Sequence, residues 1–411
     1  MIKEIPHNFK VDSIQAPASK SYAQRAILAA TLCQGTSTIL NVGQSNDVNQ
    51  IIEVSRHLGA EIRGDQNKLT VMGKKYPPKM TLNCGESGLG IRLTASVAAA
   101  IGGEFELIGS GSLLSRTMDG FIEFLPKLGV EFQSKGSFPP LHINGKLQGG
   151  IVQIDGSISS QYLSGLLMAL PTAGQNSIIE VDELKSIPYV QMTLDLLKDF
   201  GVQVQHEEFK RFIIKGNQSY SPTTYTVEGD WSGAALWIIY GALNQKVTLK
   251  GLNKDSLQAD RAILKVLELA GASFKWESND LIVEPSALVP FEFDATHCPD
   301  LFPALVVLAA GIEGDSKIIG SDRLKNKESD RAIVLQEEFN KLGLKINLLN
   351  NEMIIQGKGK LLSGTLSSHN DHRIAMAGAI ASILTPNGVM IKGADAVNKS
   401  YPSFWNDLGI N

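Results

Sequence analysis

Lysines, arginines and small polar side chains gather in this sequence where helices are expected to begin. Ser19-Lys20-Ser21 is followed by Arg25, and Glu86-Ser87-Gly88 is followed by Arg92. Asn370-Asp371-His372-Arg373 has the same character. The N-terminus of a helix presents free N–H groups and a partial positive charge, so it is suited to binding anions. The pattern therefore indicates recognition of negatively charged small molecules.

Three further segments complete a set of six polar helix starts: Ser159-Ser160-Gln161, Glu228-Gly229-Asp230-Trp231-Ser232-Gly233 and Pro299-Asp300. Ser, Asp and Asn also cap helices without any ligand, and this is the plain alternative for each segment taken alone. Capping does not account for Lys20, Arg92 and Arg373, because cations are unfavourable near the positive end of a helix. These charges require an anion or a carboxylate as partner.

Four more polar segments are predicted to open a second series of helices: Ser115-Arg116-Thr117, Ser186-Ile187-Pro188-Tyr189, Lys327-Glu328-Ser329-Asp330-Arg331 and Lys399-Ser400-Tyr401-Pro402. Lys327 and Arg331 are four residues apart, so we expect them on one helical face, where like charges repel. Ion pairs with Glu328 and Asp330 on a solvated surface would relieve that repulsion. The functional interpretation is a cationic wall for a phosphate or a carboxylate.

The elements that must position these residues recur along the chain. A hydrophobic residue followed by Gly and an Ala, Val, Leu or Ile appears every 66 to 72 residues, at 58–60, 128–130, 200–202, 270–272, 342–344 and 408–410. Each ends a helix-like pattern, where Gly supplies the C-cap conformation, so one structural unit is repeated six times. In each unit we expect a small-residue helix such as 24–33, a strand such as 36–42, an amphipathic helix, and two short strands such as 60–63 and 68–72.

This rhythm of helices and strands predicts an α/β fold, or α+β by some schemes. The first helices are apolar nearly all round, so we expect helices inside and sheets outside. A six-bladed propeller would need about four strands per repeat and no long helices, and an all-helical solenoid would lack the strands. A chain of 411 residues is too long for one core, and the polar segment 217–224 is the expected boundary between two domains.

The composition argues against several classes of protein, namely membrane-spanning, secreted, disulfide-rich and nucleic-acid-binding proteins. The sequence has no run of about 18 apolar residues and no apolar stretch near Met1 typical of a signal peptide. Three cysteines without CxxC spacing make a disulfide framework an unfavoured interpretation. A net charge of −4 argues against nucleic acid as a partner. We expect a cytoplasmic protein with no membrane partner.

From Ala16 to Trp405 the sequence resembles the 5-enolpyruvylshikimate-3-phosphate synthases, the shikimate-pathway family of enolpyruvyl transferases. The resemblance is carried, in order, by Ala18-Ser19-Lys20-Ser21 with Arg25, Asp155-Gly156-Ser157-Ile158-Ser159-Ser160-Gln161, Lys185 to Tyr189, Pro299-Asp300, Lys327 to Arg331, Asn370 to Arg373, and Lys399. It implies a two-domain inside-out α/β barrel of six βαβαββ repeats, three per domain. Residues 19–228 would form the N-terminal lobe, and residues 1–18 with 229–411 the C-terminal lobe, with the active site in the cleft between them.

The resemblance also implies the reaction. The family transfers the enolpyruvyl group of phosphoenolpyruvate to the 5-hydroxyl of shikimate-3-phosphate and releases phosphate, by addition and elimination through a tetrahedral intermediate. It uses no metal and no organic cofactor, its members are expected to be monomers, and glyphosate is the inhibitor to be tested. Both substrates are polyanions, which would account for the cations at the helix starts.

Residue roles carry over by position. The shikimate-3-phosphate set is Lys20, Ser21, Arg25, Ser159, Ser160, Gln161, Ser186, Tyr189, Asp300 and Lys327. The phosphoenolpyruvate set is Lys20, Gly88, Arg92, Arg116, Gln161, Arg331, Arg373 and Lys399. The catalytic candidates are Asp300 as base, Glu328 as proton donor, and Lys20. The sequence does not assign each proton to one of the three.

Some positions depart from the family pattern. Leu89 stands where Thr is usual, Thr117 where a proline follows the arginine, and Arg323 where Asn or Glu is frequent. These changes bear on affinity and on the response to glyphosate rather than on the type of reaction.

Two other functions and a metal site stay open at this stage. A UDP-N-acetylglucosamine enolpyruvyl transferase has the same architecture, but many members carry a reactive Cys in the segment that corresponds to 109–116, which has none here. Cys84 is earlier and is interpreted as structural. A non-catalytic binder of phosphorylated molecules would be expected to lack Asp300 or Glu328. His369 and His372 have spacing that permits a metal, without an accompanying Cys or Glu cluster.

Overall fold

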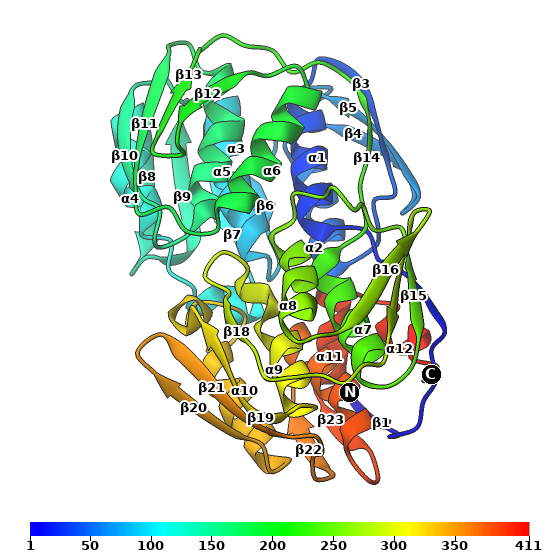
Figure 1. Cartoon of the computed structure of the whole chain (residues 1–411). Coiled ribbons are helices and arrows are strands. Elements are labelled where there is room, and N and C mark those ends of the chain that lie inside the picture. The colour runs from blue at the N-terminus through cyan, green and yellow to red at the C-terminus, as the bar shows by residue number, and fades with distance from the viewer. Residues whose placement is uncertain (411) are drawn as a thin grey trace. The chain divides into compact units, whose positions relative to one another are not determined.

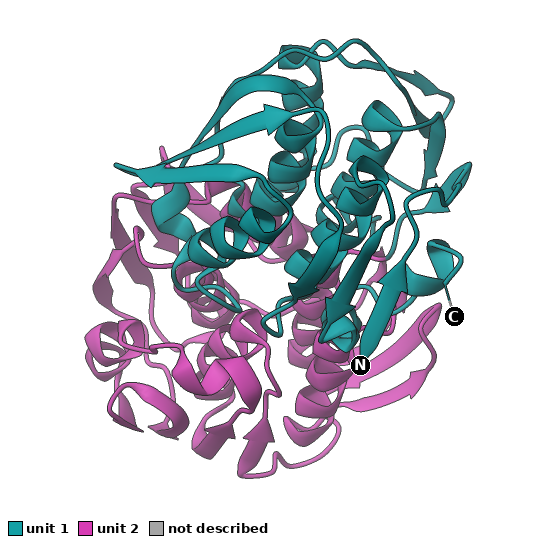
Figure 2. Cartoon of the chain, turned by 90° about the horizontal axis from the view of Figure 1, so that it is seen from below, with its two compact units in different colours: residues 1–17, 228–411 teal, residues 18–227 magenta. Residues whose placement is uncertain are grey.

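The computed structural model describes residues 1–410, which form two compact units. Unit 1 comprises Met1–Pro17 and Glu228–Asn411, and unit 2 comprises Ala18–Val227 (Figures 1 and 2). Each unit contains three small sheets and two sets of helices. In both, the order strand, helix, strand, helix, strand, strand recurs along the chain, except that the last repeat ends with α12 among the described residues.

Unit 2 holds three four-stranded sheets. Their strand orders are β14-β3-β5-β4 (Thr224–Thr226, Gly35–Leu40, Lys68–Gly73, Glu61–Gly64), β6-β7-β9-β8 (Thr81–Asn83, Gly103–Ile108, Phe138–Gly145, Val130–Lys135) and β10-β11-β13-β12 (Ile151–Asp155, Ser177–Asp182, Arg211–Ile214, Val204–Glu207). The first helices are α1 (Lys20–Leu32), α3 (Gly88–Ile101) and α5 (Ser160–Ala169), and the second helices are α2 (Asn46–His57), α4 (Gly120–Phe124) and α6 (Ile187–Asp199). Short 3-10 helices are η1 (Gly111–Ser115), η2 (Pro126–Leu128) and η3 (Leu170–Thr172).

Unit 1 holds two four-stranded sheets and one of three strands. Their orders are β16-β17-β15-β2 (Ser273–Glu277, Asp280–Glu284, Val247–Lys250, Ser13–Gln15), β18-β19-β21-β20 (Glu292–Asp294, Glu313–Ile319, Glu352–Lys358, Lys345–Leu349) and β1-β23-β22 (Ile2–Ile5, Val389–Lys392, Gly364–Ser367). The first helices are α7 (Trp231–Leu243), α9 (Phe302–Ala310) and α11 (His372–Ala381), and the second are α8 (Ile263–Leu269), α10 (Arg331–Lys341) and α12 (Phe404–Asp407). The 3-10 helices are η4 (Ala259–Ala262), η5 (Pro299–Leu301), η6 (Ser321–Leu324), η7 (Ser382–Leu384) and η8 (Ala394–Lys399).

The first helices form the interior of each unit. Every residue of α9 and α11 is buried, and α7, α9 and α11 pack on one another. In unit 2, α3 packs on both α1 and α5 (Figure 1). The strands, in contrast, alternate buried and exposed residues, as in β10, so one face of the sheet covers the helices and the other meets solvent. The arrangement of buried helices inside and sheets outside is confirmed for each unit.

Two strands are exchanged between repeats. A first helix normally joins two parallel neighbours in one sheet, as α5 joins β10 and β11. The strand before α1, however, is β2, which pairs in parallel with β15 of unit 1. The strand before α7 is β14, which pairs in parallel with β3 of unit 2. The sheet of one repeat is thus completed by the first strand of another.

The recurring glycines have the backbone conformation that the pattern predicts. Each follows the last turn of a second helix with φ in the left-handed region: Gly59, Gly129, Gly201, Gly271, Gly343 and Gly409. Gly adopts that conformation without the Cβ strain that other residues meet there, which is why it marks the helix end in every repeat. The helix-ending conformation expected at these six glycines is confirmed.

Three of the predicted second-helix starts are wrong. Helix α10 begins at Arg331, so Lys327 lies in the preceding loop and the two cations do not share a helical face. Arg116 lies between η1 and α4, because α4 begins only at Gly120. Lys399 is the last residue of η8, ahead of α12. The loop places Lys327 against Asp300, and Arg331, which also pairs with Asp300, begins the helix. Asp300 is distant in the sequence, so residue spacing alone does not reveal these ion pairs.

Across residues 1–410 no helix combines the length and the apolar character needed to cross a bilayer.

Gly357 offers a test of the helix-to-sheet packing. A Cβ at this position of β21 would lie 2.1 Å from both the Ala309 and the Ile312 carbonyl oxygens, so the backbone would have to shift. We expect Gly357→Ala to lower the free energy of unfolding by about 2–3 kcal/mol, as measured by urea denaturation. The matched control is Gly174→Ala, whose Cβ would meet no atom within 4 Å. Equal stability of the two variants would contradict this packing.

Candidate active site

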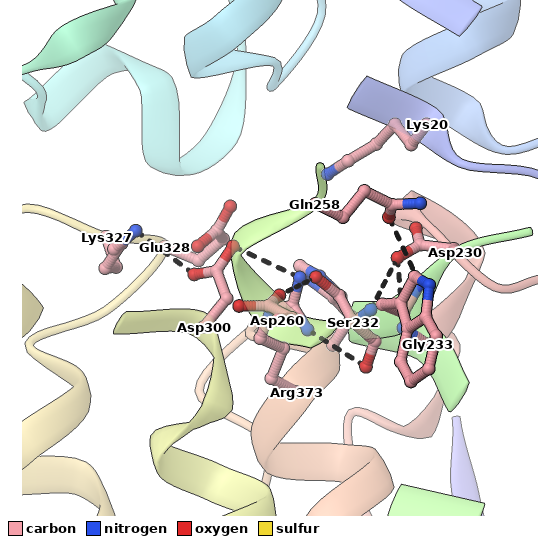
Figure 3. A network of polar contacts seen from close by, with 12 residues as sticks. Lys20, Asp230, Ser232, Gly233, Gln258, Asp260, Asp300, Lys327, Glu328 and Arg373 are labelled. Atoms are coloured by element: carbon pink, nitrogen blue, oxygen red, sulfur yellow. Dashed lines mark hydrogen bonds and ion pairs between the residues drawn. The ribbon is translucent and has the colours of Figure 1, made fainter. Parts of the chain in front are cut away.

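Asp300 is the centre of a cationic cluster in unit 1 (Figure 3). It lies in η5, immediately before α9. Its Oδ1 is 3.1 Å from Lys327 Nζ and 2.9 Å from Arg331 Nη1, and its Oδ2 is 3.2 Å from Arg373 Nη2. The carboxylate is 23% exposed, so it is reachable by a ligand. Three cations from two segments, residues 327–331 and the start of α11, therefore converge on one partly open carboxylate.

Arg331 ties these segments together. Its side chain is fully buried, and its Nε and Nη2 donate to the two oxygens of Asp371 at 2.9 and 3.3 Å. The same Nη2 lies 2.8 Å from Glu328 Oε2. Every N–H-bearing atom of the guanidinium thus meets a carboxylate, which is what a buried arginine requires. We refer to Asp300, Lys327, Glu328, Arg331, Asp371 and Arg373 as the Asp300 cluster.

Asp371 also builds the start of α11. It is the N-cap, and its Oδ1 accepts from the Arg373 backbone N–H at 3.0 Å. The two residues before it, His369 and Asn370, both have positive φ, a conformation that costs a non-glycine residue energy. The tight turn aims Arg373 at Asp300 and allows its Nη1 to donate to the Ser232 carbonyl at 3.5 Å.

The charges in the cluster set one another's pKa. Burial alone would raise the pKa of Asp300, but Arg373, Lys327 and Arg331 hold it well below its ordinary value. Burial lowers the pKa of Lys327, against the opposing effect of Asp300. Asp371, Asp300 and Glu328 outweigh burial and raise the pKa of Arg331. Asp300 is therefore an ionised carboxylate at neutral pH, able to accept a hydrogen bond or a proton from a ligand.

Lys399 belongs to the same unit. It ends η8, which packs on α11, and it is buried. Together with Asp300, Glu328, Lys327, Arg331 and Arg373 it makes up the part of the predicted site that unit 1 carries.

A second group lies where α3 and α5 meet in unit 2. Arg92 Nη1 donates to Gln161 Oε1 at 2.8 Å and to the Gly88 carbonyl at 3.3 Å, and its Nη2 donates to the Thr117 carbonyl at 3.1 Å. Its guanidinium lies 5.1 Å above the Tyr162 ring, a cation–π contact.

Gly88 allows two guanidiniums to approach the start of α3. A Cβ there would lie 2.5 Å from Arg116 Nη1 and 3.2 Å from Arg92 Nη1. The structure thus brings Gly88, Arg92, Arg116 and Gln161 together, as the sequence predicts for one binding set. We call these four residues the Arg92 cluster.

Arg25 is a fully buried cation held by neutral oxygens. Its Nε donates to Thr193 Oγ1 at 2.8 Å and its Nη1 to the Ser21 carbonyl at 2.8 Å, and the Tyr189 carbonyl is 3.4 Å from Nη2. Burial lowers its pKa to about 10, so it is charged at neutral pH. Its contacts join the starts of α1 and α6, which places Ser21, Arg25 and Tyr189 in one neighbourhood.

The remaining predicted residues of unit 2 also lie at helix starts. Ser159 caps α5, accepting from the Gln161 backbone N–H at 3.2 Å, and Ser160 is its first residue. Ser186 caps α6 with φ of 56°, an outlier for serine. Lys20 begins α1, and its Nζ lies 3.0 Å from Asp47 Oδ2.

Sequence reasoning missed several carboxylates that hold these cations. Asp371 was visible only as part of a helix start, and its pairing with Arg331 spans forty residues. Asp47, which pairs with Lys20, stands in none of the sequence motifs, and neither does Asp260, which accepts a hydrogen bond from Ser232 instead of pairing with a cation. His369, one of the two histidines whose spacing permits a metal, has its Nε2 2.6 Å from Glu338 Oε1.

The described residues include neither a metal-type ligand cluster nor an exposed thiol. Within residues 1–410, no three His, Cys, Asp or Glu side chains are grouped so as to hold a metal ion. Cys84 is fully buried, and burial raises the pKa of its thiol to about 12. Both observations agree with a structural role for Cys84.

The fold is shared with solved enolpyruvyl transferases. The enolpyruvyl transferase NikO of Streptomyces tendae matches with a TM-score of 0.80 at 16% identity, covering 99% of this chain and 96% of that one. A structure of EPSP synthase from Acinetobacter baumannii matches with a TM-score of 0.83 at 25% identity, covering 99% of this chain and 97% of that one.

The family follows from the sequence comparisons. Residues 10–408 match the family model described as EPSP synthase (3-phosphoshikimate 1-carboxyvinyltransferase). Proteins named 3-phosphoshikimate 1-carboxyvinyltransferase from Clostridium kluyveri and Clostridium novyi are 38% and 39% identical, over 96% and 99% of this chain and 93% and 96% of theirs. The chain belongs to the EPSP synthase family.

The Arg331 network predicts a large stability effect. Arg331→Met would leave Asp371 buried without its cation, so we expect a loss of about 3–5 kcal/mol in the free energy of unfolding. The control is Lys317→Met. Lys317 also pairs with two carboxylates, Glu292 and Glu352, but it is 31% exposed, and its loss is expected to cost less than about 1 kcal/mol. Guanidinium-induced unfolding of both variants measures the difference, and similar costs would contradict the structural role of Arg331.

Proposed function

We propose that this chain transfers the enolpyruvyl group of phosphoenolpyruvate to the 5-hydroxyl of shikimate-3-phosphate and releases phosphate. Membership of the EPSP synthase family supports this reaction. The observation that carries the chemistry is Asp300, an ionised carboxylate surrounded by Lys327, Arg331 and Arg373. A base among cations is what deprotonation of a hydroxyl beside two anionic substrates requires.

The proposal includes the finer architecture and the place of the site. Each unit would be an inside-out α/β barrel of three βαβαββ repeats, and the active site would be assembled from groups of both. The predicted residues for each substrate come from both units, so binding either substrate would need groups of both. Units 1 and 2 would have to bring the Asp300 and Arg92 clusters to the same bound molecules, by a closure that substrate binding drives.

Shikimate-3-phosphate would be bound mainly by hydroxyls and amides. We assign to it Lys20, Ser21, Arg25, Ser159, Ser160, Gln161, Ser186, Tyr189, Asp300 and Lys327. The contacts of Arg25 with Ser21 and Tyr189 support this grouping, since they place three of these residues together. The N-terminal N–H groups of α5 suit an anionic phosphate.

Phosphoenolpyruvate would be bound mainly by guanidiniums. We assign to it Lys20, Gly88, Arg92, Arg116, Gln161, Arg331, Arg373 and Lys399. The close approach of Arg92 and Arg116 at Gly88 supports this, because paired guanidiniums bind phosphate and carboxylate oxygens with matched geometry. In the Asp300 cluster, Arg373 could bind the carboxylate of phosphoenolpyruvate while it stays paired with Asp300.

The reaction would proceed by addition and then elimination. The 5-hydroxyl oxygen bonds to C2 of phosphoenolpyruvate while its proton passes to Asp300, and a proton is added to the methylene carbon to give a tetrahedral intermediate. The bond from C2 to the phosphate oxygen then breaks, phosphate leaves, and the methyl carbon loses a proton to restore the double bond. Glu328 is the proposed donor to the methylene carbon, with Lys20 as a further participant.

The other proposed properties rest on the family and the composition. We propose a monomeric cytoplasmic enzyme that needs no metal or organic cofactor, with no nucleic-acid or membrane partner. Glyphosate is the proposed inhibitor, and Leu89, Thr117 and Arg323 are the positions that would alter its affinity. Thr117 is in contact with the Arg92 cluster, since its carbonyl accepts from Arg92.

A coupled phosphate-release assay tests the function. We expect phosphate only when phosphoenolpyruvate and shikimate-3-phosphate are both present, and undiminished turnover in a chelator. Replacing shikimate-3-phosphate by UDP-N-acetylglucosamine should abolish release, and turnover with that sugar nucleotide would establish the other transferase activity. Binding of both substrates without release would make the chain a non-catalytic binder.

Asp300→Asn is expected to reduce kcat by about 100-fold or more, because the amide keeps the shape of the side chain but cannot accept the hydroxyl proton. Steady-state phosphate release at saturating substrates measures the effect. Asp315→Asn, an exposed carboxylate in β19 of the same unit, is the control and should keep wild-type activity. A loss of tenfold or less for Asp300→Asn would remove Asp300 as the base.

A further inference from the structure

Asp260 is a buried carboxylate that the proposed mechanism does not use. It lies in η4 and is 1% exposed. Its Oδ2 accepts a hydrogen bond from Ser232 Oγ, whereas its buried Oδ1 has no hydrogen-bond partner among residues 1–410 (Figure 3). An ionised carboxylate in such a position is poorly stabilised, because one of its oxygens is shielded from bulk solvent and no described N–H or O–H group donates to it.

The charges that face Asp260 belong to the Asp300 cluster and its surroundings. Asp300 on η5 and Asp230 at the start of α7 disfavour its negative charge, and Arg373 on α11 favours it. Cys298, just before η5, also faces Asp260: burial and then the charge of Asp260 raise the pKa of its thiol. Ser232 connects Asp260 to Arg373, because its hydroxyl donates to Asp260 and its carbonyl accepts from Arg373.

The resting cluster has no surplus of positive charge. Lys327, Arg331 and Arg373 are matched by Asp300, Glu328 and Asp371 through direct ion pairs. Asp260 adds a further carboxylate, yet no ion pair with a cation is described for it. An anion that binds at Arg373 would add negative charge beside these groups, so one carboxylate must give up its charge or repel the ligand.

We propose that Asp260 takes up a proton from solvent when an anionic substrate binds at Arg373, and so balances the charge of the site. This inference rests on the proposed function for the identity of the anion. Asp300, Glu328 and Asp371 each have a direct ion pair with a cation, whereas the hydrogen bond described for the Asp260 carboxylate comes from the Ser232 hydroxyl. Asp260 would act on charge and on the placement of Ser232 and Arg373, and not on the reacting atoms.

The titration of Asp260 is consistent with this role. Burial and then the charge of Asp300 raise its pKa to about 7, although Arg373 lowers it. An anion that engages Arg373 weakens that stabilisation and raises the pKa of Asp260 further. Below about pH 7 the free protein already carries the proton, so binding takes up little. Above that pH binding takes up as much as one proton, and affinity falls by up to tenfold per pH unit.

The test compares Asp260→Asn with wild type in kcat/KM for phosphoenolpyruvate from pH 6.5 to 9, at saturating shikimate-3-phosphate. Asparagine keeps an acceptor for Ser232 and mimics the protonated acid. Phosphate monoesters lose their second proton near pH 6, so the phosphate group of the ligand keeps both its negative charges over most of this range. We expect the ratio of variant to wild type to rise at least fivefold between pH 7 and pH 9, through KM rather than kcat.

The control is Glu268→Gln in α8, an exposed carboxylate whose loss changes net charge equally. Its ratio to wild type should not change with pH. A ratio for Asp260→Asn that is also constant with pH would overturn the proposal and leave Asp260 a structural residue.

Failure of the proposed function is recognised separately, as absence of phosphate release by wild type with both substrates. Sulfate, a dianion throughout this range, then serves as the probe. Its protection of wild type against thermal unfolding should fade between pH 7 and pH 9 while protection of Asp260→Asn persists, and equal fading in both proteins, or no protection of either, would overturn the inference.

Discussion

The burial of Arg331 is the constraint on which the unit 1 site depends. A guanidinium with no exposed surface must have its donors satisfied, and here Asp371, Glu328 and Asp300 do so. Those carboxylates belong to the start of α11, the loop before α10, and η5. Because each segment supplies one partner of Arg331, the ion pairs hold three separate pieces of backbone together. Lys327 and Arg373 then also pair with Asp300.

Unit 2 holds its cations by a different principle. The contacts described for Arg25 go to hydroxyl and carbonyl oxygens, and those of Arg92 go to an amide oxygen and two carbonyls. Neutral acceptors orient a guanidinium without cancelling its charge. Positive charge is therefore balanced in the Asp300 cluster but retained at Arg25 and Arg92. A site that must hold a base and also attract two polyanions needs both arrangements.

The sequence predicted much of this because helix starts are local features. Ser19 before α1, Ser159 before α5 and Asp371 before α11 are recognisable from residue type and from the hydrophobic pattern that follows. The glycines that end the second helices are equally local. In contrast, the position of Lys327 depends on a carboxylate 27 residues away, and the sequence placed it wrongly on a helix. Asp260 and Asp47 have no local pattern at all, because their importance arises only when the fold brings them to Ser232 and Lys20.

The exchanged strands have a consequence for how the molecule is encoded. Unit 2 is a single stretch, 18–227, whereas unit 1 is assembled from the pieces on either side of it, and β1 and β2 of the first piece pair with β23 and β15 of the second. In genetic terms one domain is an insertion within another. A circular permutant that opens at Ala18 and links the old ends would make both domains uninterrupted reading frames, joined by one covalent connection instead of two. Comparing its stability with that of the natural chain would separate the contribution of the two covalent connections from the contribution of side-chain contacts.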